Sequence, residues 1–129
     1  MAEAVDALVI GGGPAGLMAA DALAQAGRRV VVAEGKPSAG RKFLMAGKSG
    51  LNLTKDEPFE TFLAAFGEAA EPLRPMLEAF DMNDVQDWAR GLGQEVFTGS
   101  SGRVFPVAMK ASPLLRAWLG RLAGMGVEL

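Results

Sequence analysis

Three glycines near the start of the chain have the spacing of a nucleotide-binding turn. Gly11, Gly13 and Gly16 give the pattern G-x-G-x-x-G. An apolar run over 7–10 precedes them, and Pro14 suits the first turn of the helix that should follow. In this pattern the first glycine allows a tight turn, the second lets the backbone approach a pyrophosphate, and the third lets the helix lie close to the strand. Free N–H groups at the helix start favour phosphate oxygens, so the spacing predicts a phosphate cradle.

A carboxylate follows at the distance that such a cradle requires. The apolar run over 30–33 is typical of a second buried strand, and it ends at Glu34, 18 residues after Gly16. A carboxylate there can accept hydrogen bonds from both ribose hydroxyls, and it would repel a 2′-phosphate, which disfavours NADP at this site. Because strand, glycines, helix, second strand and acid occur in order, we favour nucleotide binding over a plain βαβ unit with a glycine turn.

The residue types that are missing exclude several kinds of chemistry. The 129 residues include no cysteine, no histidine and no tyrosine. Disulfides, thiolate metal sites and dithiol redox centres are therefore excluded, and the commonest general base is absent. No metal site is expected, and any redox chemistry has to reside in a bound cofactor. The net charge of −2 gives no indication of a nucleic-acid partner or of an anionic membrane surface.

Length and hydropathy indicate a globular protein. The length suits one domain, and the 50% hydrophobic and 22% charged content is that of a folded chain. The acidic start differs from a signal peptide, and no apolar stretch approaches the ~20 residues of a membrane span. A cytoplasmic location is the expectation.

The segment 35–54 is rich in glycine and carries four cations, at Lys36, Arg41, Lys42 and Lys48. Its composition predicts a long loop with a short extended piece at 43–45. On composition alone a solvated surface loop is favoured. The segment nevertheless leaves the carboxyl end of the second strand, where ligands of open α/β sheets bind.

The rest of the chain predicts mostly helices. The first opens at Pro58, the second covers 72–80 with Pro75 in its first turn, and the third has Asn83 as its cap. Gln86 would complete a capping box with Asn83. A hairpin over 95–98 and 103–105, a helix capped near 112, and a strand beginning at 127 are expected to follow.

Three stretches together resemble one known family. They are VIGGGPAGLMAA at 9–20, GRKFLMAGKSGLNLT at 40–54 and GSSGRVFPVAMKASPLLRAWL at 99–119. The first is shared by many flavoproteins, and the other two are more specific. Together they resemble the bacterial FAD-dependent oxidoreductases of the HI0933-like, BaiN-like type. Leu51 stands where the commonest family version has a cysteine, so a role for that cysteine cannot be transferred.

The resemblance implies an α/β fold, namely a Rossmann-like FAD-binding domain of the glutathione-reductase type with a parallel sheet and a βαβ start. Residues 1–129 would be the N-terminal segment of that domain, with 56–93 as a helical insertion. Family members are longer, so the domain is expected to be incomplete. The resemblance implies pyrophosphate binding at Gly11, Gly13, Pro14, Ala15 and Gly16, ribose binding at Glu34, contacts along the ADP side from Arg41 and Lys42, and a flavin pocket lined by Gly47, Asn52, Leu53 and Thr54.

The expected function is that of an FAD-binding flavoprotein oxidoreductase, which passes a hydride from NAD(P)H through flavin to an unknown small organic acceptor. No catalytic residue is identified, and Lys48 is the only candidate near the expected flavin position. These residues alone are expected to be inactive and to self-associate. The alternatives are a non-catalytic module that binds the ADP moiety and a fragment of an NAD-linked dehydrogenase. A yellow protein would favour the first interpretation, and a colourless protein that binds NADH would favour the alternatives.

Overall fold

The computed structural model describes residues 4–129, which form two compact units. The first unit runs to Ala46 and includes Leu115–Leu129, so both ends of the chain contribute to it. The second unit is the continuous segment Gly47–Leu114. The helical insertion expected over 56–93 lies within the second unit.

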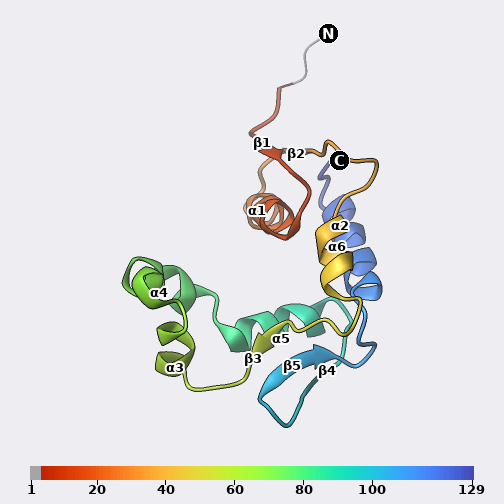
Figure 1. Cartoon of the computed structure of the whole chain (residues 1–129). Helices are drawn as coiled ribbons and strands as arrows, with labels where there is room; N and C mark the ends of the chain where they lie inside the picture. Colours follow the sequence, from red (N-terminus) through yellow and green to blue (C-terminus); the bar gives the residue numbers. More distant parts are fainter. Residues whose placement is uncertain (1–3) are drawn as a thin grey trace. The chain divides into compact units, whose positions relative to one another are not determined.

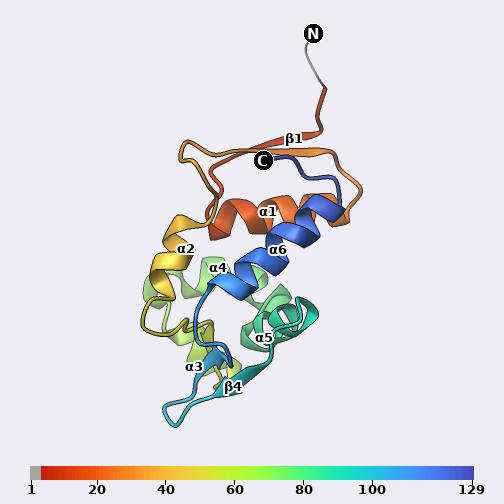
Figure 2. The same cartoon turned by 90° about the vertical axis from the view of Figure 1, so that its right-hand side faces the viewer.

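The first unit is built on a parallel pair of strands. β1 (Ala7–Ile10) and β2 (Val30–Ala33) pair in register from Ala7 with Val30 to Ile10 with Ala33. Between them the chain forms α1 (Pro14–Gln25), which lies along one face of the pair (Figures 1 and 2). Both strands have the bounds that the sequence predicts, and the βαβ start is confirmed.

The end of the chain adds one parallel bridge to this pair. The Val32 N–H donates to the Glu128 carbonyl over 2.7 Å, and the Glu128 N–H donates to the Val30 carbonyl over 3.2 Å. Glu128 bridges Val31 in parallel, so β2 lies between β1 and the end of the chain. The strand expected to begin at 127 is therefore present only as a single parallel bridge beside the two-stranded sheet.

The segment after β2 is not the extended piece that we predicted at 43–45. It forms the helix α2 (Arg41–Ala46), which follows Gly40 at a φ of 74°. Its arginine, lysine, leucine, methionine and alanine are good helix formers, and the loop composition of 35–40 obscured them. The Phe43 ring packs edge-on against Trp118 of α6 (Ser112–Gly124), with centroids 6.3 Å apart.

The core of the first unit contains one acid. Leu17, Val32 and Trp118 are buried, and Asp21 is only 2% exposed. The Trp118 Nε1–H donates to the Asp21 carboxylate over 2.9 Å, and Gln25 donates to the same group. A buried carboxylate is tolerated when it is hydrogen-bonded, so this contact fixes α6 on α1.

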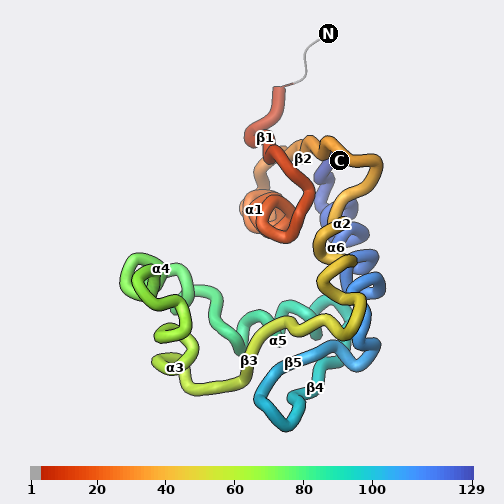
Figure 3. Tube along the Cα trace, in the orientation of Figure 1, coloured from red at the N-terminus to blue at the C-terminus, as the bar shows by residue number. Residues whose placement is uncertain are grey.

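The second unit combines a small antiparallel sheet with short helices. The sheet has the order β3-β5-β4 (Thr54–Lys55, Arg103–Pro106 and Val96–Thr98), and the predicted hairpin is its β4–β5 pair. β3 is too short to be recognised from periodicity. Figure 3 follows the chain through the helices, which are α3 (Phe59–Ala64), the 3₁₀ turn η1 (Gly67–Ala69), α4 (Ala70–Ala79) and α5 (Met82–Gly91).

Two helix starts differ from the prediction. α4 begins at Ala70 and not at 72, which places Pro75 inside the helix. The cap of α5 is Asp81, which accepts from the Asp84 N–H, while the Asp84 carboxylate accepts from the Asp81 N–H. This capping box lies two residues before the one expected at Asn83. Starting there puts Met82 inside the helix, where only 5% of it is exposed.

One face of the parallel pair is apolar and open. Leu8 is 59% exposed and Ile10 77%, and among residues 4–129 only the opposite face is covered by a helix. Exposed apolar strand faces drive association. We therefore expect the average mass from static light scattering to rise with protein concentration. Ile10→Thr, which suits a strand, should reduce that rise. Met76→Ser on α4 is the control, since Met76 is a similarly exposed residue outside this face. A constant monomer mass would contradict this expectation.

Candidate nucleotide-binding site

The glycines of the turn between β1 and α1 have distinct surroundings. Gly11 has a φ of 100°, and its N–H donates to the Ala33 carbonyl over 2.7 Å. Gly13 caps α1 in an extended conformation, and a Cβ built on it would have no heavy atom within 4 Å. A Cβ on Gly16 would lie 1.9 Å from the Gly11 carbonyl oxygen. Gly16 is thus required for packing, whereas Gly13 borders open space.

Glu34 holds this turn through its carboxylate. Oε1 accepts from the Gly12 N–H over 2.8 Å, and Oε2 accepts from the Lys36 N–H over 2.9 Å. The backbone hydrogen bond from Lys36, followed by that from Gly12, lowers the pKa of Glu34 below its ordinary value of 4.5. The Gly12 carbonyl accepts from the Gly40 N–H over 2.8 Å. The acid therefore stays ionised at neutral pH and ties the glycine turn to the loop after β2.

A pocket of about 350 Å³ opens at this turn. It combines the open side of the glycine turn with one carboxylate and three cations. Of the residues predicted for the ADP part, Gly11, Ala15 and Gly16 belong to the turn and the helix start but do not line the pocket. The lining residues are Gly12, Gly13, Pro14, Glu34, Lys36, Ser38, Gly40, Arg41 and Lys42.

Four of these lining residues were not among the predicted site residues: Gly12, Lys36, Ser38 and Gly40. Lys36 and Gly40 belong to the glycine- and cation-rich loop, whose composition was the available signal. Ser38 accepts from the Arg41 Nε–H over 3.3 Å, and nothing in the sequence indicated this contact. Gly12 lies between two motif glycines and becomes part of the site through its bond to Glu34.

A second hollow of about 380 Å³ adjoins the first. Glu34, Lys36 and Ser38 line both, so Glu34 stands between the two compartments. The second hollow adds Pro37, Ala39, Leu119 and Leu129 to its wall. One compartment lies beside the helix start and the other lies beyond the acid.

The residues expected to line a flavin pocket lie in the second unit. Gly47 is buried there, and a Cβ on it would lie 2.7 Å from the Ala111 nitrogen. The Asn52 Nδ2 donates to the Thr54 carbonyl over 2.8 Å, and the Leu53 N–H donates to the Val104 carbonyl over 2.9 Å. These contacts hold the segment before β3 in place, and the flavin contacts of the four residues remain a prediction.

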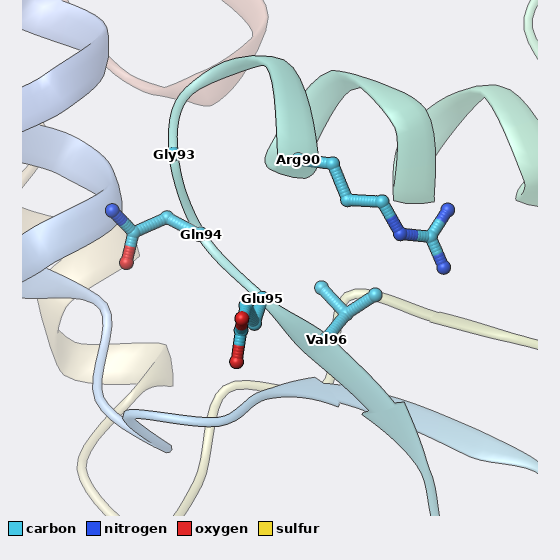
Figure 4. A pocket seen from close by; sticks show the side chains of 5 residues that line it. All are labelled: Arg90, Gly93, Gln94, Glu95 and Val96. Carbon is cyan, nitrogen blue, oxygen red and sulfur yellow. The ribbon is translucent and has the colours of Figure 1, made fainter.

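The other polar features of the second unit do not form a site. A hollow of about 370 Å³ lies where α5 ends, but the side chains of Arg90, Gln94 and Glu95 point in different directions (Figure 4). Arg74 joins α4 to α3 by donating to Glu60 over 2.8 Å, which lowers the pKa of the Glu60 carboxyl. Within residues 4–129, no group of three or more acids or other metal ligands could hold a metal ion.

The parallel βαβ unit, its glycine turn and the acid after β2 define a nucleotide-binding domain of the Rossmann class. Residues 5–129 match the family model described as the HI0933-like protein Rossmann domain. The chain belongs to this family. This agrees with the resemblance seen in the sequence.

A comparison with solved structures gives the same fold. The crystal structure of Thermovibrio ammonificans THI4 is similar with a TM-score of 0.57 and 21% sequence identity. The match covers 96% of this chain and 37% of that one, so this chain spans little more than a third of the length of its structural neighbour. Over the part of the chain that the structure describes, no helix has the length and apolarity needed to cross a membrane.

Proposed function

We propose that this chain binds FAD through its ADP moiety and serves a flavoprotein oxidoreductase. The observation that carries the proposal is the open space at Gly13, bordered by the Glu34 carboxylate and by Lys36, Arg41 and Lys42. A diphosphate needs backbone N–H groups and cations, and a ribose diol needs an ionised acceptor. The pocket supplies both, so the residues present fit the group.

Each part of the ADP moiety has residues suited to it. The pyrophosphate would lie at the start of α1, beside Gly13 and Pro14, where the helix dipole favours negative charge. The ribose hydroxyls would donate to Glu34, whose lowered pKa keeps it an acceptor. The adenine would occupy the second hollow, between Ala39 and Leu119.

The chemistry itself would come from the cofactor. FAD, when bound, supplies a ring that takes up and releases hydride, here from NAD(P)H to a small organic acceptor. The task of this chain is to bind and orient the cofactor. The segment with Gly47, Asn52, Leu53 and Thr54 is proposed for the flavin end, and Lys48 is the nearest candidate for a proton donor.

The absorption spectrum of the purified protein tests this proposal. Flavin bands that are released on denaturation, together with competition between FAD and ADP for one site, are the expected result. A colourless protein that binds ADP and NADH, and that binds FAD no more tightly than ADP, would instead favour the non-catalytic ADP module. A protein that binds none of the three would contradict the assignment of the pocket.

Glu34→Ala should weaken ADP binding roughly tenfold or more, because two ribose hydroxyls lose a charged acceptor. Isothermal titration at pH 7 measures the loss. In the unaltered chain the affinity should be retained at neutral pH and lost at acid pH, as the pH drops through the lowered pKa of Glu34 and the carboxylate is protonated. Glu95→Ala, outside both hollows, is the control. An unchanged affinity in the Glu34 variant would remove this residue from the site.

A further inference from the structure

A third cavity, in the second unit, is apolar over most of its wall. It has a volume of about 540 Å³, within the ~300–1,000 Å³ of small-molecule sites. Its wall comes from the segment 52–57, which includes β3, and from α3, α4, α5 and the residues that follow α3 and α4. Figure 1 shows α3 and α4 side by side, with β3 and α5 beyond them. The apolar lining residues are Leu53, Phe62, Phe66, Leu77, Phe80 and Val85.

Two of these aromatic rings are partly exposed. Phe66, which precedes η1, is 39% exposed, and Phe80, which caps the end of α4, is 40% exposed. The Phe66 ring is held edge-on to Phe62, with centroids 5.5 Å apart. A planar ring placed in the cavity could make the same edge-to-face contact with these rings.

The polar groups of the cavity come from one short segment, 52–57. They are Asn52, Thr54, Lys55 and Glu57. Lys55 and Glu57 pair over 3.7 Å, so together they bring no net charge to this end. The Asn52 Nδ2 is engaged by backbone carbonyls, which leaves Oδ1 to accept from a ligand hydroxyl. The Thr54 hydroxyl can donate or accept.

We propose that this cavity binds an uncharged, hydroxylated aromatic compound, with its ring among Phe62, Phe66 and Phe80 and its hydroxyl toward Asn52 and Thr54. The apolar wall excludes a nucleotide, whose phosphates would lie against phenyl rings without a compensating cation. A charged head group is disfavoured because the only cation and the only acid of the lining neutralise each other. The site shares no lining residue with the ADP pocket. It shares Asn52, Leu53 and Thr54 with the segment proposed for the flavin end, so the inference rests on the proposed function in placing the compound beside the flavin ring.

The test uses the neutral fluorophore N-phenyl-1-naphthylamine, whose emission rises in apolar surroundings. The expected result is saturable binding at one site per chain. 2-Naphthol should displace the fluorophore at lower concentration than naphthalene, and 2-naphthoate should be the weakest of the three. Saturating ADP should displace none of it.

Two substitutions on α3 separate the cavity from general apolar surface. Ala65→Trp fills the cavity, because Ala65 lines it and is exposed, so the fold should survive. Ala64→Trp is the matched control, an exposed neighbour outside the lining. The fluorophore should bind the control like the unaltered chain and should not bind Ala65→Trp. Circular dichroism establishes that both variants are folded.

A third substitution tests the polar end. Thr54→Val keeps the shape and removes the hydroxyl, so the preference for 2-naphthol over naphthalene should shrink. Equal fluorophore binding by both tryptophan variants would overturn the site. Displacement of the fluorophore by ADP would show that the cavity is not separate from the nucleotide pocket. Tighter binding of 2-naphthoate than of 2-naphthol would show that the cavity does not prefer uncharged compounds. If the fluorophore emission instead changed in proportion to the self-association of the protein, the apolar lining of the cavity would be a contact surface for a second copy of the chain.

Discussion

Gly13→Val should abolish ADP and FAD binding while leaving the fold intact. Gly13 caps α1 at a φ of −83° and a ψ of −176°, a conformation that valine adopts without strain. A side chain at this position meets no protein atom within 4 Å, so it would project into the pocket and not into the core. The space it occupies is the space proposed for the pyrophosphate.

Isothermal titration with ADP measures the loss of binding, and far-ultraviolet circular dichroism shows whether the fold is intact. Gly120→Val is the control, because a Cβ on Gly120 also meets no heavy atom within 4 Å, but Gly120 lies on α6, outside both hollows. If Gly13→Val retained flavin through purification, the turn would not be the phosphate site.

Gly16→Ala, unlike Gly13→Val, should destabilise the fold itself. The added Cβ would lie 1.9 Å from the Gly11 carbonyl oxygen and 3.2 Å from Val9 Cγ1. The first neighbour is backbone, so α1 can make room only by moving away from β1. We expect a loss of about 3 kcal/mol or more in the free energy of unfolding, at the upper end of overpacking effects.

Urea denaturation followed by tryptophan fluorescence measures this loss. Gly120→Ala serves as the comparison, since its Cβ meets nothing within 4 Å. That substitution should raise the free energy of unfolding by about 0.5–1 kcal/mol, because alanine loses less backbone entropy in a helix. A stable Gly16→Ala variant would show that the helix does not need this close approach.

The sequence was most informative where one local rule acts alone. The bounds of β1 and β2 and the order of glycines and acid follow from apolar runs and turn chemistry, and the structure has them where predicted. It was least informative where tertiary partners decide. The burial of Asp21 depends on Trp118, 97 residues away, and no helical pattern contains that information.

The candidate site divides in the same way. The motif predicted Gly13 and Glu34 as binding residues, and the family resemblance added Pro14, Arg41 and Lys42. All five line the pocket. The bonds from Glu34 to Gly12 and Lys36 were missed, because Glu34 was considered only as a ligand for ribose. These bonds give Glu34 a role before any nucleotide binds, so its loss should also loosen the turn. The helix α2 was missed because glycine and proline in 35–40 dominated the composition.

The first unit is formed by segments from both ends of the chain, and this affects the order in which the two units fold during synthesis. Gly47–Leu114 contains all the strands of its own sheet and can begin to fold as soon as it has left the ribosome. The β1–α1–β2 segment is made earlier, yet it must wait for Trp118 to cover Asp21 and for Glu128 to pair with β2. The part of the chain translated first is therefore expected to be among the last to become protected from proteases.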